Sequence, residues 1–251
     1  MYTISVGFQK GGVGKTSLTL ALSAYLKNIG KRVLVVDLDS QGNTTSTLRG
    51  SKEGATIADV LSGSVAAKEA IIPANVDLIA GNIRLNTDDP ISEGDFTALK
   101  KALSPLKKLY DYCVIDIGPA MGLLMTNALA ASDGVLIPLQ ADIYSIEDLG
   151  LFIQTINGIK ASLNKKLTAL GIVVNAYESR GVLNQQALDL IIKEAAENNI
   201  RVFSPIRKAI VVKEAQALKQ PDIFSYAPAN SKVIQDYKAA FDSVLEVIEN
   251  G

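Results

Sequence analysis

A run of glycines and lysines near the N-terminus carries the clearest chemical signal in the chain. Residues 9–17 read Gln-Lys-Gly-Gly-Val-Gly-Lys-Thr-Ser. The pattern for phosphate binding is Gly, four residues and then Gly-Lys-Ser/Thr, so Gly14-Lys15-Thr16 fits its end while Gln9 replaces its first glycine. Lys15 is expected to reach the β- and γ-phosphates of a nucleotide, and the Thr16 hydroxyl to ligate Mg²⁺. A second lysine, Lys10, follows Gln9. Because Lys15 already accounts for the phosphates of this loop, Lys10 is not expected to bind them.

The segments on either side of this run fit a phosphate site. Residues 3–8 are predicted as a short buried strand and residues 17–29 as an amphipathic helix. Glycines between a strand and a helix let backbone N–H groups converge on oxygens, and the helix N-terminus adds a positive dipole. The nucleotide is therefore expected to bind along the whole loop, at Lys10, Gly11, Gly12, Val13, Gly14, Lys15, Thr16 and Ser17.

Two carboxylates lie where later strands are expected to end. Asp116 closes the apolar run that starts at Tyr112, and it suits an acid that orients Mg²⁺ or its water shell. Asp39 lies just beyond the run 33–37, where it is placed to orient a water for attack on the γ-phosphate, and Gly42 gives that segment freedom to move. In open α/β sheets, ligands bind at the C-terminal ends of the strands. We therefore expect Thr16, Asp39 and Asp116 near the metal, and Lys10, Lys15 and Asp39 in the chemistry.

The composition narrows the class of protein. The chain has 251 residues, of which 48% are hydrophobic and 20% charged, as expected of a globular protein. Its net charge of −1 gives no overall attraction to nucleic acid, so such binding requires a local basic patch. It has no histidine and one cysteine, Cys113, which excludes catalysis by histidine and a disulfide framework. The chain starts directly with a predicted strand and has no apolar run near the ~20 residues that cross a membrane, so we expect a cytoplasmic protein.

Strand-like and helical patterns alternate along the chain. Several strand-like runs are apolar nearly throughout, which indicates burial on both faces. This alternation predicts an α/β fold, with a doubly wound, mostly parallel sheet and helices on both faces, in a single domain over residues 1–251. The predicted strands are 3–8, 32–37, 76–80, 112–117, 134–138, 169–175 and 200–203. The predicted helices lie near 17–29, 56–62, 95–109, 122–132, 145–162, 183–198 and 229–249, and residues 81–95 are predicted to form a long surface loop.

The motifs at residues 10–16, 37–43 and 114–119 together resemble those of the ParA/Soj family of partition ATPases, which belong to a wider class with altered phosphate loops that includes MinD. The resemblance runs from residue 3 to about residue 240. It implies an ATPase in which Lys10 crosses to a partner subunit, so that a homodimer sandwiches two ATP molecules. It also implies that Asp39 is required for hydrolysis but not for ATP binding. The residues implied at the adenine are Asn175 and, in the loop 205–209, Arg207 and Ala209.

Three positions depart from the family pattern. Ser40 replaces the common proline of Asp-x-Asp-Pro-Gln, Gly118 replaces the first proline of Asp-x-Pro-Pro, and Phe8 stands where many members have asparagine. None of these changes removes a charged catalytic group. ATP hydrolysis with weak intrinsic turnover is therefore still expected.

The resemblance implies partners as well. Dimers of the family bind nonspecific DNA through basic residues, and a centromere-binding ParB-type or analogous adaptor protein stimulates hydrolysis. Residues 201–219 hold five cations against one acid, Glu214, although Val211 occupies a place where many members carry a cation. Phosphate contacts of this kind weaken steeply with salt. We expect a nucleoid-associated protein whose DNA contacts are Arg180, Arg207, Lys208, Lys213 and Lys219.

Other functions of the same fold remain open. A MinD-like membrane switch needs a C-terminal helix with a basic polar face, whereas the tail from residue 238 onward has one basic residue and three acids. An iron–sulfur carrier needs paired cysteines, and Cys113 is alone. A ParA-like ATPase that positions a protein cargo on the nucleoid is not separated from DNA partition by the sequence, because a partner protein reads the cargo.

Overall fold

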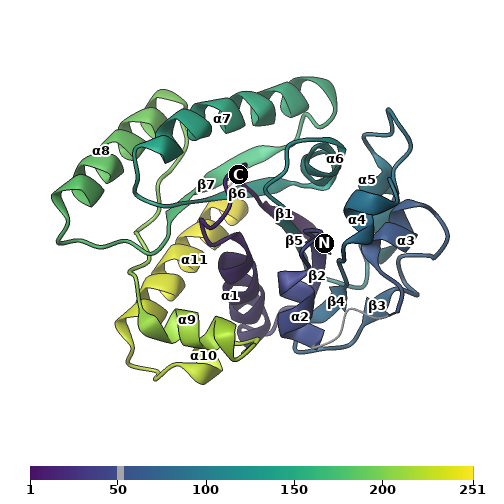
Figure 1. Ribbon diagram of the computed structural model, residues 1–251, viewed down its shortest axis with the longest axis horizontal. Helices are drawn as coiled ribbons and strands as arrows, with labels where there is room; N and C mark the ends of the chain where they lie inside the picture. The colour runs from purple at the N-terminus through teal and green to yellow at the C-terminus, as the bar shows by residue number, and fades with distance from the viewer. Residues whose placement is uncertain (50–53, 251) are drawn as a thin grey trace.

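A seven-stranded sheet forms the centre of the molecule (Figure 1). The computed structural model describes residues 1–49 and 54–250. Along the sheet the strands follow the order β3-β4-β2-β5-β1-β6-β7, and neighbouring strands are parallel except for the edge pair β3 and β4. The bounds are β1 Tyr2–Val6, β2 Val33–Leu38, β3 Ile71–Ile72, β4 Asp77–Ile79, β5 Tyr112–Ile117, β6 Gly134–Leu139 and β7 Thr168–Val174. The predicted fold class is confirmed.

The order of the strands shows where a ligand must bind. The chain places β2 and β4 on one side of β1, returns through β5, and then continues to β6 and β7 on the other side. The strand order therefore reverses beside β1, which is where doubly wound sheets bind ligands. The central strands are buried along nearly their whole length, which explains their apolar sequences. Within them, Asp37 of β2 lies directly opposite Asp116 of β5.

Helices cover both faces of the sheet (Figure 1). One face carries α3 (Ile57–Leu61), α5 (Ala98–Leu103), α6 (Leu123–Ala131), α7 (Tyr144–Ser162) and α8 (Val182–Glu197) around one apolar core. The other carries α1 (Lys15–Asn28), α2 (Asn43–Arg49), α9 (Ile210–Ala217), α10 (Ile223–Tyr226) and α11 (Lys232–Asn250) around a second. Cys113, the second residue of β5, is fully buried.

The two helices that frame the second core differ in character. An amphipathic helix was predicted over 17–29, but α1 is buried at every position from Leu18 to Leu26. That prediction is wrong because β5 covers one side of α1 while α2, α10 and α11 cover the others. The terminal helix α11, predicted over 229–249, buries an apolar stripe that includes Val233, Tyr237 and Phe241. Within the two described ranges, no helix combines the length and apolar character needed to cross a membrane.

Several short elements differ from their predictions. The predicted strand 200–203 is wrong, because its residue Val202 forms only an isolated bridge with Ile172 of β7. The predicted helix 95–109 is α5 followed by a 3₁₀ turn, Ser104–Leu106, since Pro105 lacks the N–H that a continuing α-helix needs. The elements β3, α2, α9 and α10 were not predicted. They are too short to show a long apolar period.

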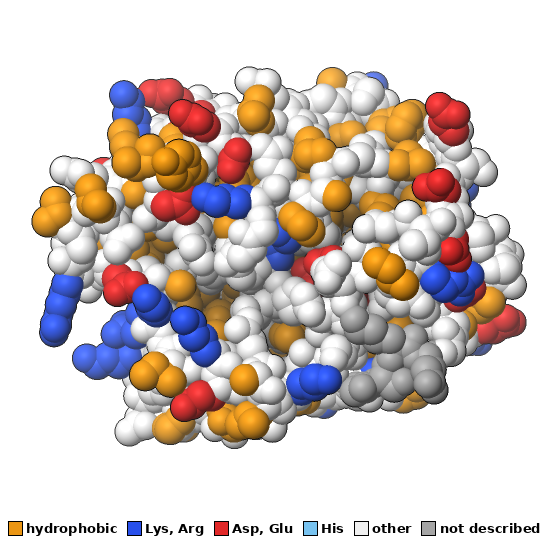
Figure 2. Space-filling view, in the orientation of Figure 1, with side chains coloured by type: hydrophobic (Ala, Val, Ile, Leu, Met, Phe, Trp, Pro, Cys, Tyr) orange, Lys and Arg blue, Asp and Glu red, His pale blue; other side chains and the backbone are white. Residues whose placement is uncertain are grey.

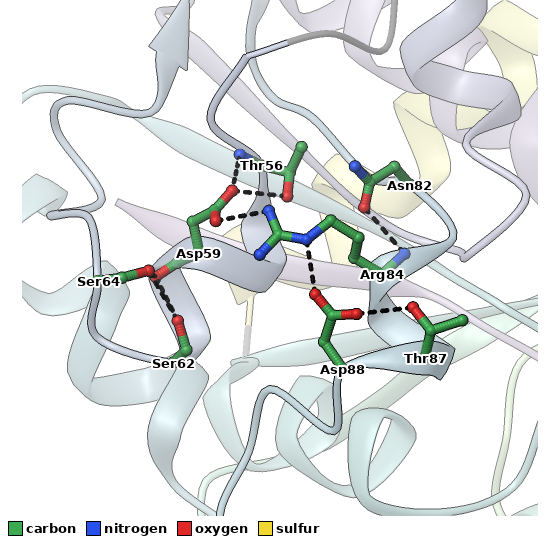
Figure 3. Close-up of polar contacts among 8 residues, drawn as sticks. All are labelled: Thr56, Asp59, Ser62, Ser64, Asn82, Arg84, Thr87 and Asp88. Atoms are coloured by element: carbon green, nitrogen blue, oxygen red, sulfur yellow. Dashed lines mark hydrogen bonds and ion pairs between the residues drawn. The ribbon is translucent and has the colours of Figure 1, made fainter.

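Residues 81–95, predicted as a long surface loop, contain the short helix α4 (Arg84–Thr87), shown in Figure 3. Arg84 lies 2.6 Å from Asp59 and 2.6 Å from Asp88, so it ties α4 to α3. Asp59 also accepts a hydrogen bond from the Thr56 N–H at 2.8 Å, which completes a capping box at the start of α3. Apart from α4 the segment has no helix or strand, as predicted; α4 was missed because its main ion pair joins residues 25 positions apart.

Candidate functional site

The glycine loop is held by side chains from the ends of two other strands. Gly14, with φ of 92°, begins α1 in a left-handed conformation. A Cβ at this position would lie 2.9 Å from Asn175 Nδ2, so the close packing also requires glycine. Asn175 Nδ2 donates to Val13 O at 3.1 Å, and Gln140 Nε2 donates to Gly12 O at 2.9 Å. These bonds occupy carbonyl oxygens of the loop, which suits anion binding because only its N–H groups attract phosphate.

Lys15 is the first residue of α1 and turns back toward its own loop. Its Nζ donates to Lys10 O at 2.6 Å, and the residue is buried. Burial lowers the pKa of Lys15, while the charges of Asp116 and Asp39 act in the opposite direction. An ammonium group held between the loop and two carboxylates is well placed for phosphate oxygens.

Lys10 turns away from the loop, toward the start of α7. Its Nζ lies 2.7 Å from Asp142 Oδ1, donates to Ser145 Oγ at 3.3 Å, and sits 5.9 Å from the centre of the Tyr144 ring. Burial alone would raise the pKa of Asp142, but Lys10 and Ser145 outweigh burial and lower it. The charge of Lys10 is therefore not used by its own glycine loop. In the single chain it is bound by the segment that caps α7.

Asp116 accepts hydrogen bonds from the hydroxyl groups of three threonines. Its Oδ2 accepts from Thr16 Oγ1 at 2.9 Å and from Thr44 Oγ1 at 2.6 Å, and its Oδ1 accepts from Thr19 Oγ1 at 3.3 Å. Burial, followed by the charge of Asp37 across the sheet, raises the pKa of Asp116. A buried carboxylate in this situation is stabilised by a divalent cation. Neither Thr19 nor Thr44 belongs to a motif that the sequence singled out.

Asp39 lies in the turn directly after β2. Its Oδ1 accepts from the Gln41 N–H at 2.9 Å. A Cβ at Gly118 would lie 3.4 Å from Asp39 Cγ, so the loop after β5 passes close to this carboxylate. Asp39 is 8% exposed, whereas Asp116 is 1% exposed. Asp39 also lines a cavity together with Gln41 and Gly118, so it is the more accessible of the two predicted carboxylates.

The residues present fit a nucleotide-bound Mg²⁺. Across the described residues, no group of three or more His, Cys, Asp or Glu side chains could hold a metal alone. Mg²⁺ at nucleotide sites, however, takes one or two protein oxygens and completes its shell with phosphate and water. Thr16 Oγ1 and Asp116 Oδ2, 2.9 Å apart, supply oxygens of this kind. The third predicted metal residue, Asp39, packs against Gly118, two residues beyond Asp116, so it lies close to these two oxygens.

A cavity of about 170 Å³ opens beside the glycine loop. Three residues predicted near the base, Asn175, Arg207 and Ala209, line it together with Ser17 and the loop residues 12–14. Its volume is below the roughly 300 Å³ at which sites for whole ligands begin, so it suits one end of a nucleotide. Sequence reasoning missed other lining residues because they come from distant segments without a motif, namely Gln140, Gln216 and Tyr237. The side chain of Gln216 also donates to Ser17 Oγ and so joins α9 to α1.

The five predicted DNA contacts fall into two groups. Arg207 binds both oxygens of Asp236, at 2.5 and 2.8 Å, and Lys208 lies 2.5 Å from Glu178. Both line the nucleotide cavity with Lys213. The second group, Arg180 and Lys219, is exposed and has no ion-pair partner within residues 1–49 and 54–250. Figure 2 shows lysine and arginine side chains gathered at the lower left, between α8 and α9.

Known proteins resemble this chain over its whole length. A family model described as an AAA domain matches residues 1–169. The sporulation initiation inhibitor protein Soj of Bacillus subtilis is 34% identical over an alignment of 260 residues, which covers 99% of this chain and 98% of that protein. The chromosome-partitioning ATPase Soj of Thermus thermophilus is 39% identical over 189 residues, 73% of this chain and 72% of that one.

A solved structure gives the same result for the fold. The cobyrinic acid a,c-diamide synthase of Mycobacterium smegmatis, with bound ATP analogue and magnesium, superimposes with a TM-score of 0.83 at 28% identity, and the match covers 100% of this chain and 97% of that one. The two Soj proteins are more than 30% identical to this chain across most of both chains, whereas the structural match is 28% identical. The chain therefore belongs to the Soj/ParA family of chromosome-partitioning ATPases.

Proposed function

We propose that this chain is an ATP-dependent switch for DNA partition, in which two copies close around ATP, bind DNA and separate after hydrolysis. The observation that carries the proposal is the divergence of two lysines on one loop. Lys15 Nζ lies 2.6 Å from Lys10 O, on the loop itself, whereas Lys10 Nζ is directed away toward Asp142. One lysine is sufficient for the phosphates of one loop. The other is available for a nucleotide held by a second copy.

ATP and Mg²⁺ are the proposed ligands. The structural relative from M. smegmatis was solved with an ATP analogue and magnesium. In this chain we assign the phosphates to the glycine loop and Ser17, the metal to Thr16, Asp39 and Asp116, and the base to the cavity lined by Asn175, Arg207 and Ala209. The hydroxyl of Thr16 already lies beside Asp116. Binding therefore requires no rearrangement of these two residues.

We assign the orientation of the attacking water to Asp39. It is the more exposed of the two strand-end carboxylates and lines a cavity, and its charge acts on Lys15, which is placed to bind phosphate. Lys10 from the second copy would add a cation on the opposite side of the phosphates, where charge develops during transfer. Weak intrinsic turnover belongs to this proposal, because a switch signals through the lifetime of its ATP-bound state.

DNA binding and stimulation by an adaptor protein are the outputs that we propose. The relative from T. thermophilus is named as a chromosome-partitioning ATPase. Arg180 and Lys219 are exposed and form no ion pair with any residue that the structure describes, so they can contact phosphates without first breaking one. We propose nonspecific DNA as the track, a nucleoid-associated location, and a ParB-type or analogous partner as the trigger of hydrolysis.

The structural relative named as a diamide synthase suggests a second candidate function, an ATP-dependent amidation. Covalent capture of a nitrogen donor needs an activated nucleophile such as a thiolate. The chain has one cysteine, Cys113, which is fully buried in β5, and burial raises its pKa to about 12. No substrate reaches a thiol in that position. The chemistry of the chain therefore favours the switch.

The proposal is tested by retention on nonspecific DNA. The chain is passed over immobilised DNA with ATP, with ADP and without nucleotide, at two salt concentrations, while light scattering reports its mass. We expect retention and a dimer mass with ATP only, and retention that falls steeply as salt increases. The Lys15→Ala variant, which removes the phosphate contact, serves as the control that binds neither ATP nor DNA. A chain that stays monomeric with ATP, or binds DNA equally with ADP, contradicts the proposal.

A further inference from the structure

Two adjacent threonines of α2 bind two different carboxylates at the ends of neighbouring strands. Thr44 Oγ1 donates to Asp116 Oδ2 at 2.6 Å, and Thr45 Oγ1 donates to Asp37 Oδ2 at 2.6 Å. The N–H of Thr45 donates to the same Asp37 oxygen at 2.8 Å. Both threonines and Asp37 are fully buried. The helix α2 is thus fixed at its first turn to β2 and β5 together.

Asp37 also holds the turn that carries Asp39. Its Oδ1 accepts from the Asp39 N–H at 3.2 Å, while its Oδ2 accepts from Thr45. The segment from Asp39 to Thr45 is therefore tied at both ends to one carboxylate. Gln41 and Gly42 lie between these ties and fold back on Asp39 through their own N–H groups.

The hydroxyl of Thr45 is both a donor and an acceptor of hydrogen bonds. It donates to Asp37 and accepts from the Gly81 N–H at 2.8 Å. A Cβ at Gly81 would lie 2.3 Å from Asp37 O, so the chain after β4 passes close to the backbone of β2. Valine at position 45 would keep the shape of the side chain but lose both bonds. It would leave the Gly81 N–H and one Asp37 oxygen without this partner in a buried place.

We propose that Asp37 and Thr45 are positioning residues for ATP hydrolysis, and that they act by clamping the Asp39 turn beside Asp116. Both side chains are fully buried and bonded to each other, and neither residue lines the cavity beside the glycine loop. Their effect is on where the Asp39 carboxylate lies when water attacks. A displacement of about 1 Å in a reacting group costs about a hundredfold in rate. Nucleotide binding, which depends on the glycine loop, does not pass through this clamp.

The test compares threonine variants at two positions of the same helix, on the full chain with nonspecific DNA present. Thr45→Val is expected to lower kcat at least about tenfold, with KM for ATP changed less than about threefold. Thr45→Ser, which keeps the hydroxyl, is expected to restore kcat. The matched control is Thr47→Val, because Thr47 Oγ1 donates only to Asn43 O at 3.0 Å on the exposed side of α2. Thr45→Ala provides a second hydroxyl-free variant, without the added methyl beside Gly81, should Thr45→Val fold poorly.

The inference rests on the proposed role of Asp39, and Asp39→Ala separates the two. If Asp39→Ala stops hydrolysis while Thr45→Val and Thr45→Ala match Thr47→Val, the clamp is overturned and the proposed function stands. If Asp39→Ala hydrolyses ATP normally, the role of Asp39 is overturned, and with it a clamp that acts through Asp39. A loss in Thr45→Val that appears in KM, or that Thr45→Ser does not rescue, also overturns the clamp, since it indicates a general structural effect.

Discussion

Lys10 Nζ lies 2.7 Å from Asp142 Oδ1 of the same chain, so the lysine proposed to reach a second copy forms an ion pair within its own chain. Asp142 also contacts the first turn of α7, because its Oδ1 accepts a hydrogen bond from the Ser145 N–H at 2.9 Å. Both partners of the ion pair remain about one-third exposed, at 30% and 33% of their side-chain surface. Exposed ion pairs contribute little to stability. Lys10 can therefore leave Asp142 and bind a negatively charged nucleotide on a neighbouring copy at a small cost in free energy.

Removal of the Lys10 side chain should separate binding from dimerisation. Lys10→Ala is expected to bind ATP with its affinity changed by less than about tenfold, because Lys15 and the loop N–H groups remain. It is expected to stay monomeric with ATP, since the cation offered to the second copy is gone. Binding of a fluorescent ATP analogue and light scattering on the same sample measure the two properties. An ATP-dependent dimer of Lys10→Ala would show that Lys10 acts within its own chain.

Weakening the internal partner should have the opposite effect. Asp142→Asn keeps the size of the side chain but removes the charge that holds Lys10. An ion pair this exposed is worth at most about 1 kcal/mol, so the ATP concentration for half-maximal dimerisation is expected to fall about two- to fivefold. Asp148→Asn, in the helix α7 that follows Asp142, is a control for the loss of one acid, because the Asp148 backbone rather than its carboxylate contacts the loop residue Gln9. Equal effects of the two variants would indicate a general change in charge.

Loss of the Asp39 carboxylate should trap the switch. Asp39→Ala is expected to bind ATP and dimerise, because Lys15, Thr16 and Asp116 are intact, and to lower phosphate release at least about a hundredfold. The variant should stay on DNA with ATP and resist release by an adaptor. DNA retention after removal of free ATP, followed over time, measures this. A variant that stays monomeric with ATP would place Asp39 in nucleotide binding instead.

The sequence predicted which segments meet at the site better than it predicted the contacts around them. The glycine loop, Asp39 and Asp116 follow from local patterns, because each lies at the junction of a predictable strand with the next segment. The contact of Thr44 with Asp116 did not follow, since it depends on β5 lying beside β2, and the contact of Thr45 with Gly81 depends on β4 lying on the other side of β2. The order of strands in a sheet cannot be read from a local stretch of sequence. The same reason hid Gln140 and Gln216 at the nucleotide cavity. The burial of α1 was missed because α11, which covers it, lies some two hundred residues away in the chain, as the bond between Tyr25 and Asp242 at a separation of 217 illustrates.

Acid should weaken the ion pair between Asp59 and Arg84, which joins α3 to α4. Burial alone would raise the pKa of this carboxyl group, but hydrogen bonds from Thr56 and Arg84 outweigh burial and lower it. Because the folded-state pKa lies below the unfolded value of about 4, the stabilisation is present above about pH 4 and is lost as pH falls through the folded-state pKa. The Arg84 side chain is 44% exposed and that of Asp59 14% exposed, so solvent screens the pair from the side of the arginine. Asp59→Asn is therefore expected to cost about 1 kcal/mol or less at neutral pH, about 2–4 °C in Tm.

The pH dependence distinguishes this effect from a general loss of packing. The difference in Tm between the wild-type chain and Asp59→Asn is expected to shrink as pH falls below about 4, since the wild-type carboxylate is then protonated. Asp88→Asn removes the other, more exposed partner of Arg84 and should shift Tm by less. A Tm difference for Asp59→Asn that is constant with pH contradicts the assignment to charge.

DNA binding should depend on the cations that have no internal partner. Arg180 and Lys219 are exposed and unpaired within the described ranges, while Arg207 is held by both oxygens of Asp236 and lines the nucleotide cavity. Arg180→Ala and Lys219→Ala are each expected to weaken ATP-dependent DNA binding and to reduce the slope of log affinity against log salt by about 1, the value for one lost phosphate contact. Arg207→Ala is expected to impair ATP binding first, and DNA binding only as a consequence. Lys166→Ala, exposed at the opposite ends of the strands, is the control for the loss of one positive charge. If Lys166→Ala reduces the slope as much as Arg180→Ala does, the contacts are not localised and the DNA-binding face lies elsewhere on the molecule.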